Sequence, residues 1–257
     1  MGPLIAQELG FLASTSELMK FGSLPGVWTE DSEKLKKQIL KSYSVIYLNE
    51  EIKAEALTKN IEGFTRFLYL LAAESSKFLE LSKISSASAV PRQTTQRYFE
   101  ILEDTLIVRR LNAFAKSEKR RLIQHPKFYF FDNGVLNSLL SNFTVSEDRK
   151  GQLFENLFVT QLLTTLSYSN LDYRVSNYRT DSGAEVDVIL ELDGDLLAIE
   201  VKAGHFRSSD LWGLRSFQNF VGKKVKSYVV IPEGTPRRIE DIEVLPWQEF
   251  LNLELFS

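Results

Sequence analysis

The first third of the chain has the spacing of apolar residues that is typical of amphipathic helices. Apolar side chains recur every three or four positions from Glu33 to Asn49, and the same spacing continues from Ala54 to Ala73. Glycines and a proline interrupt the pattern over residues 21–26, which indicates a loop before the first of these helices. We therefore expect a mainly helical N-terminal segment over residues 1–74.

The pattern then predicts two short helices followed by two strands. Apolar positions over residues 78–84 predict the first helix, and Pro91 stands where a second helix would begin. Branched and aromatic residues at 106–111 and 127–131 predict a pair of strands, and the basic sequence KSEKRR lies between them as a hairpin tip. A helix, a turn, a second helix and a basic hairpin form the layout of a winged helix, which we place at residues 75–145.

The last part of the chain alternates between helices and strands. In chain order the pattern predicts a helix, three strands, a helix and a fourth strand, at residues 152–166, 173–178, 185–192, 196–203, 209–221 and 227–232. The order αβββαβ predicts a three-layer domain with a mixed sheet over residues 146–257. The fold class expected for the chain is therefore α/β.

Composition narrows the chemistry that the chain can perform. Of its 257 residues, 44% are apolar and 25% are charged, which is typical of a globular protein. The chain has no cysteine, so a disulfide framework, a thiolate zinc site and a cysteine nucleophile are excluded. The two histidines, His125 and His205, stand 80 positions apart, and neither a zinc site nor a Ser-His-Asp triad is expected. Carboxylates are therefore the groups available for catalysis.

The sequence shows neither a membrane span nor a leader. No segment approaches the roughly 18 to 20 consecutive apolar residues that a bilayer span requires. The first residues, Met1 to Leu9, lack a basic stretch followed by an apolar run. We therefore expect a cytoplasmic protein with no membrane partner.

Charge is distributed unevenly along the chain. The net charge is −3, yet residues 77–127 hold 11 lysines or arginines against 5 acids, a local charge of +6. A basic helix and hairpin tip favour nucleic acid as a partner, although winged helices also dock on proteins. The expected nucleic-acid contacts are Arg92, Gln93, Thr95, Gln96 and Arg97 on the second helix, with Lys119, Arg120 and Arg121 at the hairpin tip.

Two charged side chains share one face of the third strand of the last domain. Side chains alternate across a strand, so Glu200 and Lys202 lie on one face and Leu197 on the other. If Asp187 of the preceding strand projects onto the same face, two carboxylates and one ammonium meet. Hard divalent cations prefer carboxylate oxygens, and a lysine beside them can orient an attacking water or stabilise charge at a phosphate. This group of residues predicts phosphodiester hydrolysis.

The spacing of these residues resembles that of a known superfamily of nucleases. Asp187 is followed 13 residues later by Glu200-x-Lys202, which is similar to the PD-(D/E)XK superfamily with its restriction-endonuclease-like fold. The resemblance implies Mg²⁺ or Mn²⁺ at Asp187 and Glu200, Lys202 beside the attacking water, and Glu155 as the acid on the preceding helix. Val186 stands where the proline that names the motif would be. Many members of the superfamily also lack this proline. The superfamily also contains many proteins that bind nucleic acid without cutting it.

A wider resemblance covers nearly the whole chain. The stretches FGSLPGVW, LKSYSVIYLNEEI, PKFYFFDNGV and SGAEVDVIL with AIEVKAG together resemble the C-terminal part of a large prokaryotic family of AAA-type ATPases. Full-length members begin with a P-loop ATPase domain, and Gly222-Lys223-Lys224 lacks the upstream glycine and the Ser/Thr of that motif. The resemblance implies that the partner is an ATPase domain or motor subunit, and that ATP is a cofactor only if that motor is present. We expect no ATPase activity from this chain alone.

Two hypotheses about function follow from these observations. In the first, the chain is a Mg²⁺-dependent nuclease-like protein whose winged helix binds or positions nucleic acid. In the second, it is a non-catalytic regulatory or interaction module of an AAA-type ATPase with a degenerate nuclease fold. Both hypotheses are compatible with a chain that is a fragment of a longer protein, and with a family member that has lost its ATPase domain.

Overall fold

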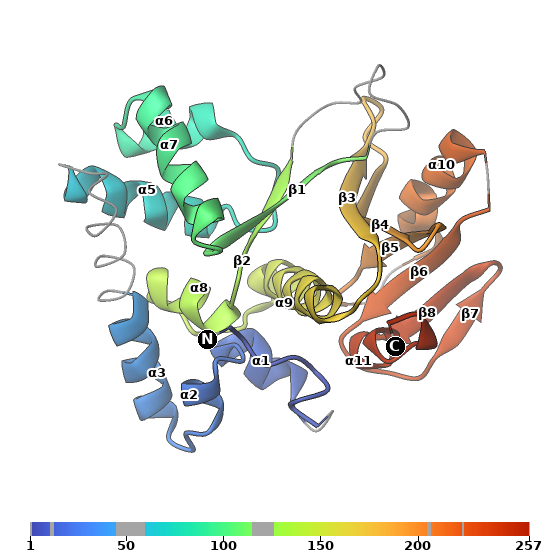
Figure 1. Cartoon of the computed structure of the whole chain (residues 1–257), viewed down its shortest axis with the longest axis horizontal. Coiled ribbons are helices and arrows are strands. Elements are labelled where there is room, and N and C mark those ends of the chain that lie inside the picture. The colour runs from blue at the N-terminus through green and yellow to red at the C-terminus, as the bar shows by residue number, and fades with distance from the viewer. Residues whose placement is uncertain are drawn as a thin grey trace. The chain divides into compact units, whose positions relative to one another are not determined.

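The computed structural model describes residues 2–10, 13–44, 60–114, 126–204, 207–222 and 224–256. The chain forms two compact units, which are described separately. Unit 1 consists of Met1–Arg110 and Phe128–Arg149, and unit 2 consists of Leu111–Lys127 and Lys150–Ser257. Figure 1 labels their helices and strands. The division into three domains, at 1–74, 75–145 and 146–257, stays a prediction.

Unit 1 is mainly helical over its described residues, as the spacing of apolar residues predicts. Its helices are α1 (Thr15–Phe21), α2 (Pro25–Trp28), α3 (Glu33–Ser42), α5 (Ile61–Ala73), α6 (Leu81–Ser88), α7 (Arg92–Asp104) and α8 (Asn133–Leu139). Buried apolar side chains join α1, α3 and α8, among them Phe21, Leu40 and Val135. Residues 45–59, which the predicted N-terminal helices include in part, lie outside the described residues. No helix within the described ranges is long and apolar enough to cross a membrane.

One buried acid fixes the junction between α1 and α8. Asp132 precedes α8, and its carboxylate accepts the backbone N–H of Ser23 at 2.8 Å and that of Val135 at 3.0 Å. It therefore caps the helix. A Cβ on Gly22 would lie 2.1 Å from the carboxylate oxygens, and the φ of 69° at this position also favours glycine. Burial outweighs the hydrogen bonds and raises the pKa of Asp132 to about 6.

The segment predicted as a winged helix has the predicted order of elements. Helices α6 and α7 are followed by β1 (Val108–Ala113) and β2 (Lys127–Phe130). Helix α7 begins directly after Pro91, as expected from the fixed φ of proline. The hairpin tip at residues 116–121 lies outside the described residues.

Unit 2 has the predicted order of one helix, three strands, a helix and a strand. Helix α9 (Glu147–Tyr168), which begins in unit 1, leads to β3 (Tyr173–Arg179), β4 (Glu185–Leu192), β5 (Asp195–Val201), the short helix η2 (Ser208–Leu211), α10 (Trp212–Val221) and β6 (Lys226–Ile231). Strands β3, β4 and β5 are antiparallel, and β6 is parallel to β5. The sheet is therefore mixed, as predicted.

The chain after β6 contains elements that the apolar pattern does not identify. They are β7 (Arg237–Ile239), β8 (Ile242–Pro246), α11 (Trp247–Leu251) and η3 (Glu254–Phe256). Strand β8 is parallel to β6, and β7 is antiparallel to β8. Over the described residues the strand order is β2-β1-β3-β4-β5-β6-β8-β7. Strand β7 is three residues long and has no buried residue, so it has no apolar alternation to recognise.

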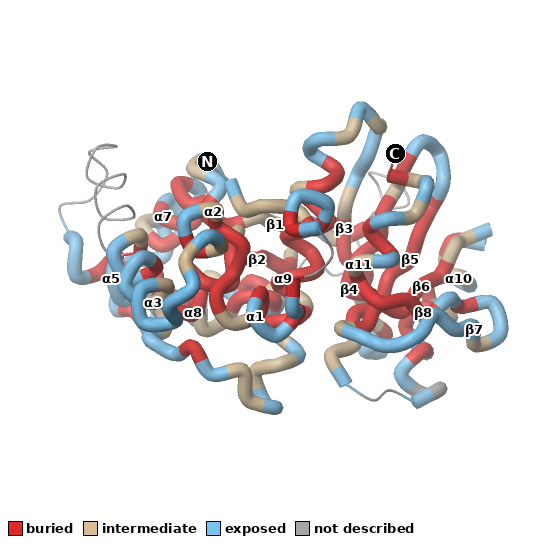
Figure 2. Tube along the Cα trace, turned by 90° about the horizontal axis from the view of Figure 1, so that it is seen from below, coloured by how far each residue is buried: buried red, intermediate tan, exposed pale blue. Residues whose placement is uncertain are grey.

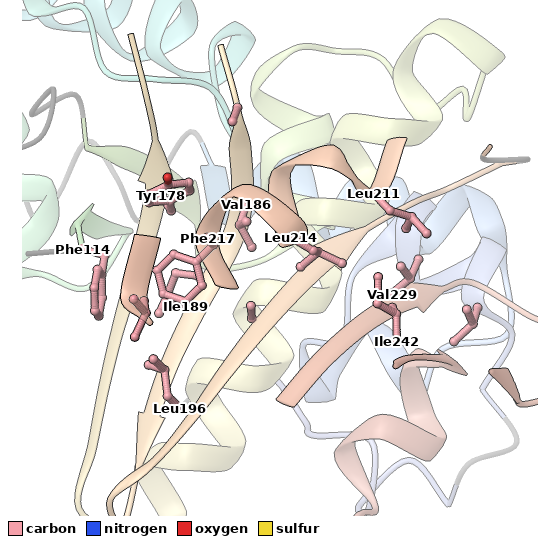
Figure 3. Packing of buried hydrophobic residues seen from close by; sticks show 14 of the residues in the cluster. Phe114, Tyr178, Val186, Ile189, Leu196, Leu211, Leu214, Phe217, Val229 and Ile242 are labelled. Atoms are coloured by element: carbon pink, nitrogen blue, oxygen red, sulfur yellow. The ribbon is translucent and has the colours of Figure 1, made fainter. Parts of the chain in front are cut away.

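Helix α10 packs on β4 and β5 and builds the core of unit 2 (Figure 3). The ring centroid of Phe217 lies 5.1 Å from that of Phe114 and 5.0 Å from that of Tyr178. A Cβ on Gly213 would lie 1.7 Å from the carbonyl oxygen of Glu185, so only glycine allows this approach of helix and strand. Figure 2 shows that β4, β5 and β6 are buried along most of their length. Charged residues inside these strands therefore need partners.

Candidate functional site

Asp187 lies in an irregular part of β4. The pairing of β3 with β4 shifts in register between Ser176 and Tyr178. As a result, two residues of β4, Asp187 and Val188, lie opposite one residue of β3, Asn177. Such a β-bulge bends a strand and redirects a side chain, and bulges are common beside active sites. The bulge therefore gives Asp187 a position that simple alternation along the strand does not predict.

A buried lysine joins Asp187 to an acid of helix α9. The Nζ of Lys127 donates to Oδ1 of Asp187 at 2.7 Å and to Oε1 of Glu155 at 2.9 Å. The side chain of Lys127 is 6% exposed, and those of Asp187 and Glu155 are 12% and 16% exposed. On β5, the backbone N–H of Val201 donates to Oδ2 of Asp187 at 2.9 Å. Both oxygens of Asp187 therefore have a hydrogen-bond donor.

Lys127 also keeps the carboxyl group of Asp187 ionised. Burial alone would raise the pKa of Asp187, but the charge and hydrogen bond of Lys127, with the N–H of Val201, hold it below its usual value. Asp187 is thus an ionised carboxylate near neutral pH, and Lys127 is its counter-ion.

Glu200 and Lys202 form a second ion pair at the end of β5. The Nζ of Lys202 lies 2.8 Å from Oε1 of Glu200, so the two side chains share a face as the strand alternation predicts. The other oxygen, Oε2 of Glu200, is buried and has no hydrogen-bond partner. Burial and the charge of Asp187 raise the pKa of Glu200 to about 8, although Lys202 acts in the opposite direction. Burial would lower the pKa of Lys202, but the Glu200 carboxylate raises it.

All four residues predicted for the catalytic site lie in this part of unit 2. Glu155 and Asp187 meet at Lys127, Glu200 meets Lys202, and the charge of Asp187 acts on Glu200. The carboxylates of Asp187 and Glu200 are the groups here that could hold a cation. Within the ranges that the structure describes, no three or more His, Cys, Asp or Glu are arranged to hold a metal ion. The ammonium of Lys127 lies between the carboxylates of Glu155 and Asp187.

The residues predicted to contact nucleic acid fall into three groups. Exposed on α7 are Arg92, Gln93, Gln96 and Arg97. Thr95 is fully buried, and its hydroxyl lies 3.3 Å from the carbonyl oxygen of Val90 and 3.2 Å from that of Pro91. Thr95 therefore packs inside unit 1 rather than facing a ligand, which corrects the prediction made for it. Outside the described residues are Lys119, Arg120 and Arg121.

Sequence reasoning misses Lys127 and the bulge at Asp187. The available signal for Lys127 is a lysine directly before the apolar sequence FYFF, because a lysine buried in an apolar strand needs an acid as partner. Its partners are 28 and 60 positions away along the chain. No local spacing connects residues so far apart.

Curated relatives of this chain come from mycobacteria and from an archaeon. The uncharacterized proteins Mb2031c of Mycobacterium bovis and Rv2008c of Mycobacterium tuberculosis are each 25% identical over 203 residues, which is 77% of this chain and 45% of theirs. The uncharacterized protein MJ1544 of Methanocaldococcus jannaschii is 27% identical over 185 residues, 68% of this chain and 40% of its own. The chain thus spans less than half the length of these relatives.

Two solved structures resemble the structure of this chain weakly and share little sequence identity with it. Can2 from Sulfobacillus thermosulfidooxidans, in complex with cyclic tetra-adenylate, is 14% identical over 86% of this chain and 55% of its own, with a TM-score of 0.31. Protein VC1899 from Vibrio cholerae is 15% identical over 88% of this chain and 56% of its own, with a TM-score of 0.30. TM-scores this low do not establish a shared fold.

Two families of unknown function cover most of the chain. Residues 13–146 match the domain of unknown function DUF8612, and residues 150–250 match the domain of unknown function DUF4143. The boundary between the two matches falls next to the point in α9 where unit 1 gives way to unit 2. The match to DUF4143 follows the match to DUF8612 along the chain. Because the first match extends over more than half of the sequence, the chain belongs to the DUF8612 family.

Proposed function

We propose that this chain is the C-terminal half of an AAA-type ATPase, and that unit 2 is a Mg²⁺-dependent, nuclease-like domain acting on phosphodiesters. The observation that carries the proposal is Oε2 of Glu200, which is buried without a hydrogen-bond partner and feels the charge of a second carboxylate, Asp187. A buried polar atom without a partner costs free energy, so a ligand that satisfies it is expected.

The residues present fit Mg²⁺ or Mn²⁺ as this ligand. Both cations bind carboxylate oxygens, and Asp187 is already ionised. Burial and, after it, the charge of Asp187 raise the pKa of Glu200, and a divalent cation next to both carboxylates would offset the repulsion between them. A cation bound here would therefore favour the ionised form of Glu200.

Each side chain of the cluster has a role in this proposal. Asp187 and Glu200 hold the cation, and Lys202 orients the attacking water or the phosphate. Lys202 suits this role because its side chain is 31% exposed, whereas that of its partner Glu200 is 9% exposed. Glu155 supports the site through Lys127. When bound, the cation supplies a Lewis acid for a phosphoryl oxygen and lowers the pKa of a bound water.

The order of elements supports the finer fold assignment. The αβββαβ order with its mixed sheet agrees with a three-layer, restriction-endonuclease-like domain, and α6, α7, β1 and β2 agree with a winged helix. On the exposed side of α7, Arg92 and Arg97 suit phosphate contacts, while Gln93 and Gln96 suit base edges. We propose this helix as the nucleic-acid contact of unit 1.

The length of the relatives supports a motor domain outside this sequence. The chain matches 45% and 40% of their lengths, which leaves room in them for a P-loop domain. In this proposal ATP binds to that motor, and the whole protein works in the cytoplasm.

A cleavage assay with one conservative variant tests the proposal. Wild type, Asp187→Asn and Asp195→Asn are incubated with single-stranded DNA, double-stranded DNA and RNA in Mg²⁺ or Mn²⁺. Asp195 is a matched control because its carboxylate is 58% exposed and pairs with Lys226 at 2.6 Å. We expect wild type and Asp195→Asn to cut and Asp187→Asn to lose about 100-fold or more in rate. A folded Asp187→Asn protein that cuts as fast as wild type would contradict the proposal.

The position of Lys127 favours one other function. Its ammonium already neutralises Asp187 and Glu155, as expected of a non-catalytic module that keeps its acids for structure. This second candidate is a regulatory or interaction module of an AAA-type ATPase. It predicts no cleavage with either metal and co-purification with an AAA-type motor domain from the same source. Failure to co-purify would count against it.

A further inference from the structure

Lys127 already contacts one carboxylate of the proposed cation site, that of Asp187. Its Nζ is 2.7 Å from Oδ1 of Asp187 and 2.9 Å from Oε1 of Glu155, both distances typical of charge-assisted hydrogen bonds. The side chain is 6% exposed, so little water competes for this ammonium. With Oδ2 of Asp187 accepting the N–H of Val201, each oxygen of this carboxylate already has a donor. A divalent cation that uses Asp187 must share or replace one of these donors.

The charges of the cluster show which donor can be replaced. The carboxylates of Glu155, Asp187 and Glu200, when ionised, carry three negative charges, and Lys127 and Lys202 carry two positive ones. A divalent cation added to all five groups leaves a buried excess of one positive charge. The same cation balances the cluster fully once one ammonium leaves. Val201 donates from the backbone of β5 and cannot leave, whereas Lys127 has a flexible side chain.

We infer that Lys127 is an internal cation that competes with the divalent cation for Asp187, so that metal binds tightly only when Lys127 releases this carboxylate. This inference rests on the proposed function of the same site and adds its regulation. Without metal, the lysine holds the two acids in place. With metal, the Asp187 carboxylate exchanges one cation for another.

Calorimetric titration of the full chain with MnCl₂ tests the inference without any activity measurement. The variants are Lys127→Met, Lys127→Arg and the control Lys226→Met. Lys226 forms an ion pair with Asp195 in the same unit, but its side chain is 39% exposed. We expect Lys127→Met to bind Mn²⁺ at least about tenfold more tightly than wild type, since a neighbouring positive charge is gone. Lys127→Arg and Lys226→Met should bind within about twofold of wild type, because the first keeps the positive charge and the second removes an exposed one.

The outcomes separate the inference from the function on which it rests. Equal Mn²⁺ affinity of wild type and folded Lys127→Met, or a lower affinity of the variant, overturns the inference and leaves the metal site standing. Absence of Mn²⁺ binding in every protein, Lys127→Met included, overturns the proposed function and the inference with it. Tighter binding by Lys127→Met supports both.

A second variant covers the case in which Lys127→Met does not fold. Removing one partner of a buried ion pair leaves an uncompensated charge, which destabilises a protein strongly. The variant Lys127→Gln removes the positive charge, so that the cluster is balanced when the cation binds, and it keeps an amide N–H that can donate to Asp187 or Glu155. We expect it to bind Mn²⁺ more tightly than wild type, and its melting temperature to rise more on adding Mn²⁺. A smaller rise than in wild type would overturn the inference.

Discussion

Each unit of the molecule buries acids, and the two units satisfy them differently. In unit 1 the carboxylate of Asp132 accepts two backbone N–H groups and caps α8. In unit 2 the carboxylates of Asp187 and Glu200 face lysine side chains, and one oxygen of Glu200 has no partner. Both Asp132 and Glu200 have a raised pKa, to about 6 and about 8, chiefly through burial.

The kind of donor distinguishes a structural acid from a candidate site. Backbone N–H groups are part of the helix and the loop that they stabilise, so the acid that accepts them belongs to the fold. Ammonium groups on long side chains can be exchanged for another cation, and buried ion pairs contribute little stability compared with apolar side chains of similar volume. The acids of unit 2 are therefore candidates for ligand binding, whereas Asp132 belongs to the fold.

The largest effect on stability is expected from Glu200→Gln. The pKa of Glu200 is raised by folding, so the folded state binds this proton more tightly, and stability falls as pH rises from about 4.5 to about 8. Glutamine mimics the neutral acid and avoids this loss. Without divalent cations, urea unfolding should show similar stability of both proteins at pH 4.5. At pH 8 the variant should be more stable by on the order of 4 kcal/mol. A less stable variant at pH 8 would show that Glu200, like Asp132, serves the fold.

A smaller effect, of opposite sign at low pH, is expected from Asp132→Asn. Asparagine turns an N–H donor toward one of the two backbone N–H groups, so at pH 4 the variant should lose about 1 to 3 kcal/mol. Because folding raises the pKa of Asp132 to about 6, wild type loses stability between about pH 4 and pH 6 and the variant does not. The difference in unfolding free energy between the two proteins should therefore change by about 2 kcal/mol between pH 4 and pH 7. If the difference in unfolding free energy did not change with pH, the raised pKa of Asp132 and the burial that causes it would be contradicted.

The smallest effect on stability is expected from Asp195→Asn, which replaces an exposed acid and with which Glu200→Gln and Asp132→Asn can be compared. Asp195 pairs with Lys226 at 2.6 Å, but the two side chains are 58% and 39% exposed. Exposed pairs of this kind contribute roughly 0 to 1 kcal/mol, so the melting temperature should change little at any pH. An effect as large as that of Glu200→Gln would mean that the different burial of Asp195 and Glu200 does not determine how much each acid affects stability.

The sequence predicts the parts of the site that depend on local spacing. Glu200 and Lys202 are two positions apart on a strand, and strand alternation alone places them together. Helix α9 and strand β4 carry apolar residues at the spacing of a helix and of a strand, which explains why the elements carrying Glu155 and Asp187 are also predicted.

Features that depend on tertiary packing are not predicted. The bulge at Asp187 comes from the register of β3 against β4, which no pattern within one strand specifies. Lys127 reaches Asp187 across 60 positions of sequence. Thr95 lies on the inner side of α7, and the sequence analysis selects it for its polarity although its hydroxyl is satisfied by backbone carbonyl groups.

Calorimetric titration with Mn²⁺ of wild type, Asp187→Asn and Asp132→Asn tests most directly whether the buried acids of the two units differ in function. If the acids of unit 2 form a cation site and that of unit 1 is structural, wild type and Asp132→Asn bind Mn²⁺ alike and Asp187→Asn loses the binding. Equal binding by wild type and a folded Asp187→Asn protein, or no binding by wild type, would contradict this conclusion.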